Sequence, residues 1–144
     1  MAALTVAQIR SRAASALSGL SGWTQSRFPP GRFGADTDQI LPLSFAVEIA
    51  STELHPSPGR QTPALGCSAE SVVVVAWAYR LRGDAAVTDL DAATAAEATM
   101  LATVVGVSQA DLHLTFEGAE RDTTTEGWLL GEARFRALHR LSLT

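Results

Sequence analysis

The apolar residues of this chain follow two spacings, and each spacing predicts a different kind of element. Over residues 6–20 they recur every three or four positions, which places them on one side of a helix. Thr5 can cap the start of that helix, and Gly19 and Gly22 supply stop signals. The same spacing predicts a second helix over residues 88–105.

Four further segments carry the patterns of β-strands. Residues 44–52, 112–117 and 128–143 alternate apolar and polar side chains, which is typical of a strand with one buried face. The polar residues 118–126 are expected to form a turn region between the last two of these strands. Residues 71–82 include four consecutive valines, which favours a central strand buried on both faces at its start. We therefore expect an α+β fold in the order α-β-β-α-β-β, with one mostly antiparallel sheet and two helices on one face.

The length and composition of the chain predict a single domain over residues 1–144. With 47% hydrophobic and 18% charged residues, the chain can bury one core. The loop over residues 53–69 is rich in proline and longer than the usual connection, and such loops commonly serve binding or assembly. No run of about 18 uncharged apolar residues occurs, so we expect no membrane span.

Charge and cysteine content narrow the classes of function. The net charge is −4, and all eleven basic residues are arginine. A protein that grips nucleic acid through its phosphates normally carries a basic balance, so we do not expect that task here. Cys67 is the single cysteine, and alone it can form neither an internal disulfide nor a thiolate metal cluster.

The sequence contains no strong catalytic or cofactor motif. It has no GxSxG nucleophile elbow, no phosphate-binding loop ending in Lys-Ser or Lys-Thr, and no GxGxxG. The histidines His55, His113 and His139 lack the short spacing of metal sites, and His139 is expected to be a hydrogen-bonded core residue. We therefore predict no enzyme, no metal and no cofactor.

Glu97 falls in the middle of the apolar face predicted for the second helix. Two interpretations stay open for it. The carboxylate either reaches the edge of that face, where water solvates it, or forms an ion pair with an arginine such as Arg80.

The last predicted strand gathers arginines on one face. Arg134, Arg136 and Arg140 stand at even spacing, and Trp128 shares their face. A solvated sheet face would account for the charges alone, but arginine mixed with apolar residues is typical of a protein interface. We therefore favour a contact between subunits on this face.

The chain resembles the tail terminator proteins of long-tailed bacteriophages and of gene transfer agents. Three stretches that together cover most of the chain carry the resemblance: TVAQIRSRAASALSGLSGWTQSRFPPGRFG, VVVVAWAYRLRGDAAVTDLDAATAAEATMLATV and EGWLLGEARFRALHRLSL. The likeness lies in the order of the elements and in the general pattern of residues along them, rather than in a catalytic signature. The fold that it implies is a small sheet flanked by two helices.

What the resemblance implies is a structural virion protein. Such proteins form a hexameric ring on the end of the finished tail tube, stop its growth and offer the surface to which the filled head attaches. The implied partners are further copies of the chain, the tail tube protein and a head-side connector or stopper protein, with DNA only passing through the lumen. The implied location is the tail or neck of the virion, after assembly in the host cytoplasm.

A ring needs one surface that fits a different surface on the next subunit. We expect the arginines of the last strand to face acids such as Glu117 or Glu120, and the loop over 53–69 to reach the tube or connector. The candidate interface residues are Arg80, Arg82, Trp128, Arg134, Arg136, Arg140, Glu117, Glu120, His55 and Arg60.

Three other functions stay open. A head completion or tail-tube adaptor protein would use a similar domain and differ in its partner. A small-ligand-binding domain would use the connector from Trp23 to Phe33 as a pocket wall around a concave apolar site. A single-stranded nucleic-acid binder would use arginine and tryptophan on an exposed sheet, although the acidic balance of the chain disfavours it.

Overall fold

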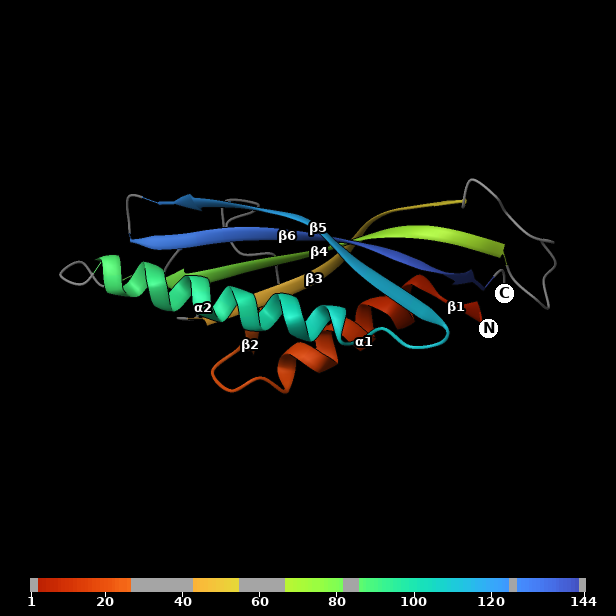
Figure 1. Cartoon of the computed structure of the whole chain (residues 1–144), viewed down its shortest axis with the longest axis horizontal. Coiled ribbons are helices and arrows are strands. Elements are labelled where there is room, and N and C mark those ends of the chain that lie inside the picture. The colour runs from red at the N-terminus through yellow and green to blue at the C-terminus, as the bar shows by residue number, and fades with distance from the viewer. Residues whose placement is uncertain (1–2, 27–42, 55–66, 82–85, 125–126, 143–144) are drawn as a thin grey trace.

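Strands make up 55% of the structure, and six of them form one sheet that curls into a half-barrel (Figure 1). The computed structural model describes residues 3–26, 43–54, 67–81, 86–124 and 127–142. The elements follow one another as β1 (Ala3–Leu4), α1 (Val6–Ser18), β2 (Thr24–Gln25), β3 (Leu43–Leu54), β4 (Cys67–Arg80), α2 (Ala86–Val105), β5 (Leu112–Thr123) and β6 (Trp128–Leu141).

The predicted α+β fold with the order α-β-β-α-β-β is wrong. The structure is a mostly β fold built on a curled six-stranded sheet, not a flat sheet with two helices on one face. The prediction missed β1 and β2 because strands of two residues are too short to show an alternating pattern. It also ended β5 too early, because residues 118–123 were expected to form a turn and instead continue the strand.

The sheet has the strand order β1-β6-β4-β3-β2, and β5 pairs with β6. The three long pairings, β3 with β4, β4 with β6 and β5 with β6, are antiparallel. The two short pairings, β1 with β6 and β2 with β3, are parallel. β4 lies between two long strands and its residues 73–78 are all buried, which confirms the expectation of a central strand.

β5 changes direction at a bulge. Its pairing with β6 shifts register between Phe116 and Gly118, so Glu117 is an extra residue in the strand. A bulge bends a strand and increases its twist. Both halves of β5 pair with β6, and in Figure 1 the two halves run in different directions.

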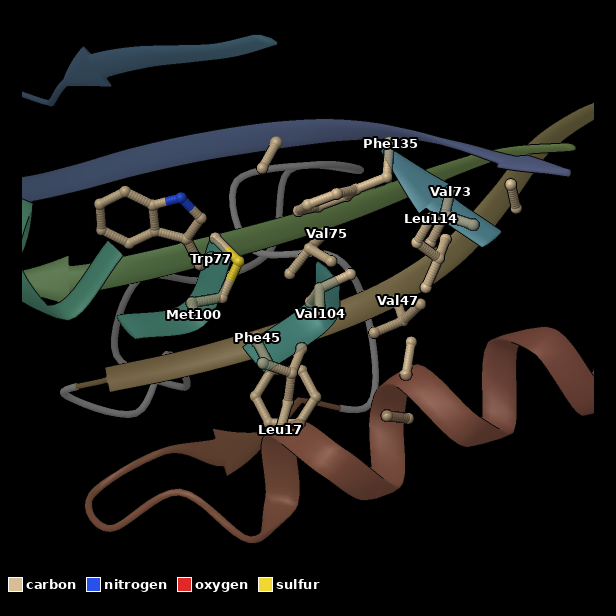
Figure 2. Close-up of a cluster of buried hydrophobic side chains, with 14 of the residues drawn as sticks. Leu17, Phe45, Val47, Val73, Val75, Trp77, Met100, Val104, Leu114 and Phe135 are labelled. Atoms are coloured by element: carbon tan, nitrogen blue, oxygen red, sulfur yellow. The ribbon is translucent and has the colours of Figure 1, made fainter. Parts of the chain in front are cut away.

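The core lies where side chains of both helices meet the sheet. Leu17 of α1 and Met100 of α2 belong to one buried cluster with Phe45, Val75 and Phe135 of the sheet (Figure 2). Each fully buried side chain of this size contributes about 1.5–3 kcal/mol relative to an exposed one. Neither of the two described helices has the length and apolar character that crossing a membrane requires.

The cap of α1 agrees with the prediction. Thr5 accepts a hydrogen bond from the backbone N–H of Gln8, and the Gln8 side chain accepts one from the backbone N–H of Thr5. This reciprocal arrangement is a capping box, which satisfies two donors at the helix start. The helix ends at Ser18, with Gly19 as its C-cap.

Glu97 is buried and forms an ion pair, but its partner is not Arg80. Both nitrogens Nε and Nη2 of Arg121, on β5, donate hydrogen bonds to the two carboxylate oxygens of Glu97. The partner was missed because Arg121 lay in the segment expected to be a turn. The pair fastens α2 to the second half of β5.

Candidate subunit interface

The alternation along β6 assigns its residues to two faces of the sheet. We call the face that carries Val75 and Phe135, both part of the core, the inner face, and the opposite one the outer face. Arg134 and Arg136 lie on the outer face, beside Val74 and Val72 of β4. The predicted sharing of one face by these arginines therefore follows from the register of the sheet.

Arg80 and Trp128 form a pair at one end of the outer face. The two residues are opposite each other in the pairing of β4 with β6, and the Arg80 guanidinium lies 5.1 Å from the centre of the Trp128 ring. A cation placed in this way is attracted to the ring. Trp128 is only 3% exposed, so it packs within its own chain and is not a free anchor for a partner, contrary to the expectation.

Arg136 is also engaged within the chain. Its Nε donates a hydrogen bond to Glu117 Oε1 at 2.7 Å, and Glu70 lies 3.9 Å away on the other side. The contact between arginine and Glu117 that was expected between subunits is thus already made inside one subunit. The bulge in β5 causes this, because it brings Glu117 beside Arg136 rather than opposite it.

Arg134 and Glu120 differ from these engaged residues. Both are exposed, and neither makes an ion pair or hydrogen bond with the described part of the chain. They line a hollow of about 320 Å³ above the β5 bulge, where a side chain added at Gly118 would meet nothing within 4 Å. The hollow is lined by Glu117, Gly118, Ala119, Glu120, Glu132 and Arg134.

The hollow contains both an arginine and a carboxylate, Arg134 and Glu120. If the hollows of two copies met each other, the same surface would be used on both copies, and the contact would join them about a two-fold axis. A ring requires two different surfaces on each subunit. The hollow therefore cannot be the whole of a ring interface.

The two edges of the sheet supply different surfaces. β5 pairs only with β6, and β2 covers only Ser44 and Phe45 of the twelve residues of β3. No other strand of the described residues pairs with the remaining edge of either one. Two large apolar side chains are exposed on these strands, Leu54 on β3 at 54% and Phe116 on β5 at 42%.

A second, more open groove lies between α1 and the end of α2. It has a volume of about 570 Å³ and is lined mostly by small and polar residues, with Arg12 at its margin. Both Nη atoms of Arg12 donate hydrogen bonds to the carboxylate of Asp111, at 2.8 and 2.9 Å. These bonds lower the pKa of Asp111 and raise that of Arg12, so both groups stay charged at neutral pH.

Of the remaining candidate interface residues, Arg140 lies on the outer face, opposite Ser68. His55, Arg60 and Arg82 lie outside the described residues, as does most of the loop expected to reach a partner. Within the described residues no three side chains of histidine, cysteine, aspartate or glutamate are arranged to hold a metal ion.

Sequence reasoning missed the hollow and the exposed edges. Both depend on where β5 runs, and the one signal for its bulge was Gly118 inside an alternating segment, which can mark a bulge as well as a turn. The free edges carried no signal, because an edge is defined by which strands pair and not by the strand's own residues.

Comparison of the chain with models of protein families and with curated proteins finds no match. The assignment to a kind of function therefore depends on the resemblance described above and on the geometry of the sheet.

Proposed function

We propose that this chain is the subunit of a ring that caps the tail tube of a long-tailed phage or related particle, ends its polymerisation and joins the tail to the head. The observation that carries the proposal is the open half-barrel with a twelve-residue strand at each side, β5 and β3, whose outer edges lack a strand partner among the described residues except where β2 pairs with Ser44 and Phe45 of β3. Such edges are templates for pairing with another chain.

Contacts through these two edges would build a ring. β5 of one copy would meet β3 of the next, so the two surfaces in contact differ and the same contact repeats from copy to copy. Because the sheet is curled, each added copy turns the direction of the following one, which favours closure over an open filament. The hollow with Arg134 and Glu120 then offers charged groups to a further partner or to the rim of this contact.

The role at the tail rests on the resemblance. It gives the ring a structural rather than an enzymatic task, with the tail tube protein on one side and a head-side connector or stopper protein on the other. DNA would pass through the lumen without being bound, and the protein would be part of the virion. A head completion or adaptor protein would use the same ring and differ only in the partner bound.

The structure gives less support to a small-ligand-binding domain. Trp23, the first residue of the connector expected to form a pocket wall, is buried, with its ring centre 6.2 Å from Phe45 and 6.4 Å from Trp77, while residues 27–33 of that connector lie outside the described residues. The two hollows described above are open and lined by charged, polar and small residues. A site for an apolar ligand would instead be concave and mostly hydrophobic.

Three charge substitutions test the edge contact. Leu54→Lys and Phe116→Lys each place a charge on one edge strand, which should block pairing because charged side chains disfavour edge-to-edge contact. Leu90→Lys is the matched control, since Leu90 is also a large exposed apolar residue, at 38%, but lies on α2. We expect the first two variants to lose self-association, measured by light scattering in the presence of the tail tube protein.

The result that supports the edge contact is loss of the ring in both edge variants with retention in L90K. Circular dichroism of each variant checks that it is folded. If folded L54K and F116K chains assemble as well as the wild type, the ring does not form through these edges.

A further inference from the structure

Three hydrogen-bonded side chains cross the inner face at the end of the sheet where β1 pairs with β6. Ser71 Oγ on β4 lies 2.8 Å from Thr52 Oγ1 on β3 and 2.8 Å from His139 Nε2 on β6. Ser71 is fully buried and His139 is 3% exposed. This chain of polar groups links three neighbouring strands.

The other ring nitrogen of His139, Nδ1, is buried and has no side-chain hydrogen bond of this kind. The Ser71 hydroxyl can donate or accept, so it satisfies Nε2 in either neutral form of the ring. A protonated ring would carry a charge away from water, which is costly.

Among the described residues, none of those paired with His139 in the sheet carries a charge, and Asp111, which precedes Leu112, is hydrogen-bonded to Arg12. The residues opposite His139 in the sheet, Ala69 and Leu112, are apolar, and the buried residues of β1 and α1 are apolar as well. The buried carboxylate of Glu97 on α2 is bonded to Arg121, which stands opposite Gly131 at the far end of β6. Glu70 and His113 alternate with the inner-face positions and so lie on the outer face.

The titration of His139 reflects this setting. Burial lowers the pKa of the imidazole below its ordinary value, and the backbone of Arg140, which favours the charged ring, offsets part of the lowering. The folded protein therefore prefers the neutral ring.

β1, the element that pairs with the residues following His139, is held by few bonds. β1 pairs with β6 at only two positions, Ala3 with Arg140 and Leu4 with Leu141, and the backbone N–H of Ser142 donates to the Leu4 carbonyl at 2.9 Å. Figure 1 shows β1 beside the end of β6. Segments with so few bonds open most readily.

We propose that Thr52, Ser71 and His139 form a proton-operated latch: with His139 neutral, the hydrogen-bonded chain holds this end of the sheet closed, and a proton bound to His139 releases β1 and the end of β6. The latch is independent of the proposed ring, since it lies on the inner face of one subunit.

The sign of the pH effect follows from the lowered pKa. Once this end opens, the imidazole returns to its ordinary pKa of about 6.5, so the open form takes up a proton first. The closed form is fully favoured above that pH and loses its advantage as the pH falls towards the lower pKa of the folded state. Within this window the opening constant rises by up to about tenfold per pH unit.

Hydrogen exchange of the full-length protein between pH 7.5 and 4.5 tests the latch. After correction for the intrinsic exchange rate, the amides of Leu4, Leu141 and Ser142 should open up to tenfold more often per pH unit below about pH 6.5. His139→Gln, which stays neutral and can still accept from Ser71, should remove this dependence. His113→Gln, which changes an exposed histidine on the neighbouring strand, should leave it unchanged.

A second readout keeps the proposal testable if H139Q does not fold. NMR of the wild-type protein should show the His139 imidazole titrating below its ordinary pKa of about 6.5, in step with the loss of protection at the end of the sheet. Exchange that does not depend on pH, an equal dependence in H139Q, or a His139 that titrates at its ordinary pKa would each overturn the latch.

Discussion

Gly131 of β6 determines how the largest side chain of the core is packed. The fully buried indole of Trp77 lies directly over this glycine in the pairing of β4 with β6. A Cβ atom at position 131 would stand 2.3 Å from Trp77 Nε1 and 2.4 Å from Cε2, far inside contact distance. Only glycine leaves room for the ring here.

Gly131→Ala is therefore expected to destabilise the fold by about 1–3 kcal/mol, because the indole or the strand must move. Gly118→Ala on the neighbouring strand is the matched control. A Cβ there meets nothing within 4 Å, so the change should stay within about 0.5 kcal/mol. Chemical denaturation of both variants measures the free energies of unfolding. Equal effects at the two positions would contradict this account of the core.

At this scale the sequence predicted some roles and not others. His139 was expected to be a hydrogen-bonded core residue, and the bond to Ser71 confirms it. The alternating pattern around position 139 was sufficient for that prediction. The need for glycine at 131 could not be predicted, because Trp77 belongs to a distant segment and the two meet only through strand pairing.

An ion pair between Glu97 and Arg121 links α2 to the sheet, and only Glu97 is buried. Glu97 is 2% exposed, whereas Arg121 remains 44% exposed on β5, and its hydrogen bonds to Glu97 raise the pKa of the guanidinium. Burial of a carboxylate is tolerated only when it is paired and hydrogen-bonded. The pair therefore fixes where α2 lies along β5.

Arg121→Ala should destabilise the protein by roughly 1–3 kcal/mol, because it leaves the Glu97 carboxylate buried without a partner. Arg12→Ala is the comparison, since it also removes one arginine bonded twice to a carboxylate. Asp111 is closer to solvent than Glu97, so the loss in R12A should be smaller. Thermal unfolding of both variants gives the order, and a larger loss in R12A would show that the Glu97 pair does not hold α2.

Elements with strong local signals were predicted well, and those set by distant contacts were not. The ends of α1 followed from Thr5 and Gly19, whose effects are local. The predicted strand over 112–117 ended too early because Gly118 and the polar residues after it resemble a turn. Only the pairing of those residues with β6 keeps them extended.

For the whole molecule, the sequence located the arginine face but not its partners. Period-two spacing correctly placed Arg134 and Arg136 on one face, since it depends on a single strand. The pairing of Arg136 with Glu117 depends on the bulge, and the position of Arg80 against Trp128 depends on the pairing of β4 with β6. These are properties of the assembled sheet, which explains why the arginine contact with Glu117 that was predicted between subunits is found within one chain.

The half-barrel leaves one strand edge at each side of the subunit, and the account of function depends on these edges. A long strand edge can pair with a strand of another chain. The exposed Leu54 and Phe116 on the two edge strands are suited to further burial. In the proposed assembly, a repeated contact between these unlike edges would give a ring.

The mass of the complex that this chain forms with the tail tube protein tests that claim most directly. Light scattering of the mixture, with negative-stain images of the same sample, measures it. The account predicts a closed ring of several copies, six by the resemblance, seated on one end of short tubes that no longer grow. A chain that stays monomeric and leaves tube growth unchanged in the mixture would contradict it.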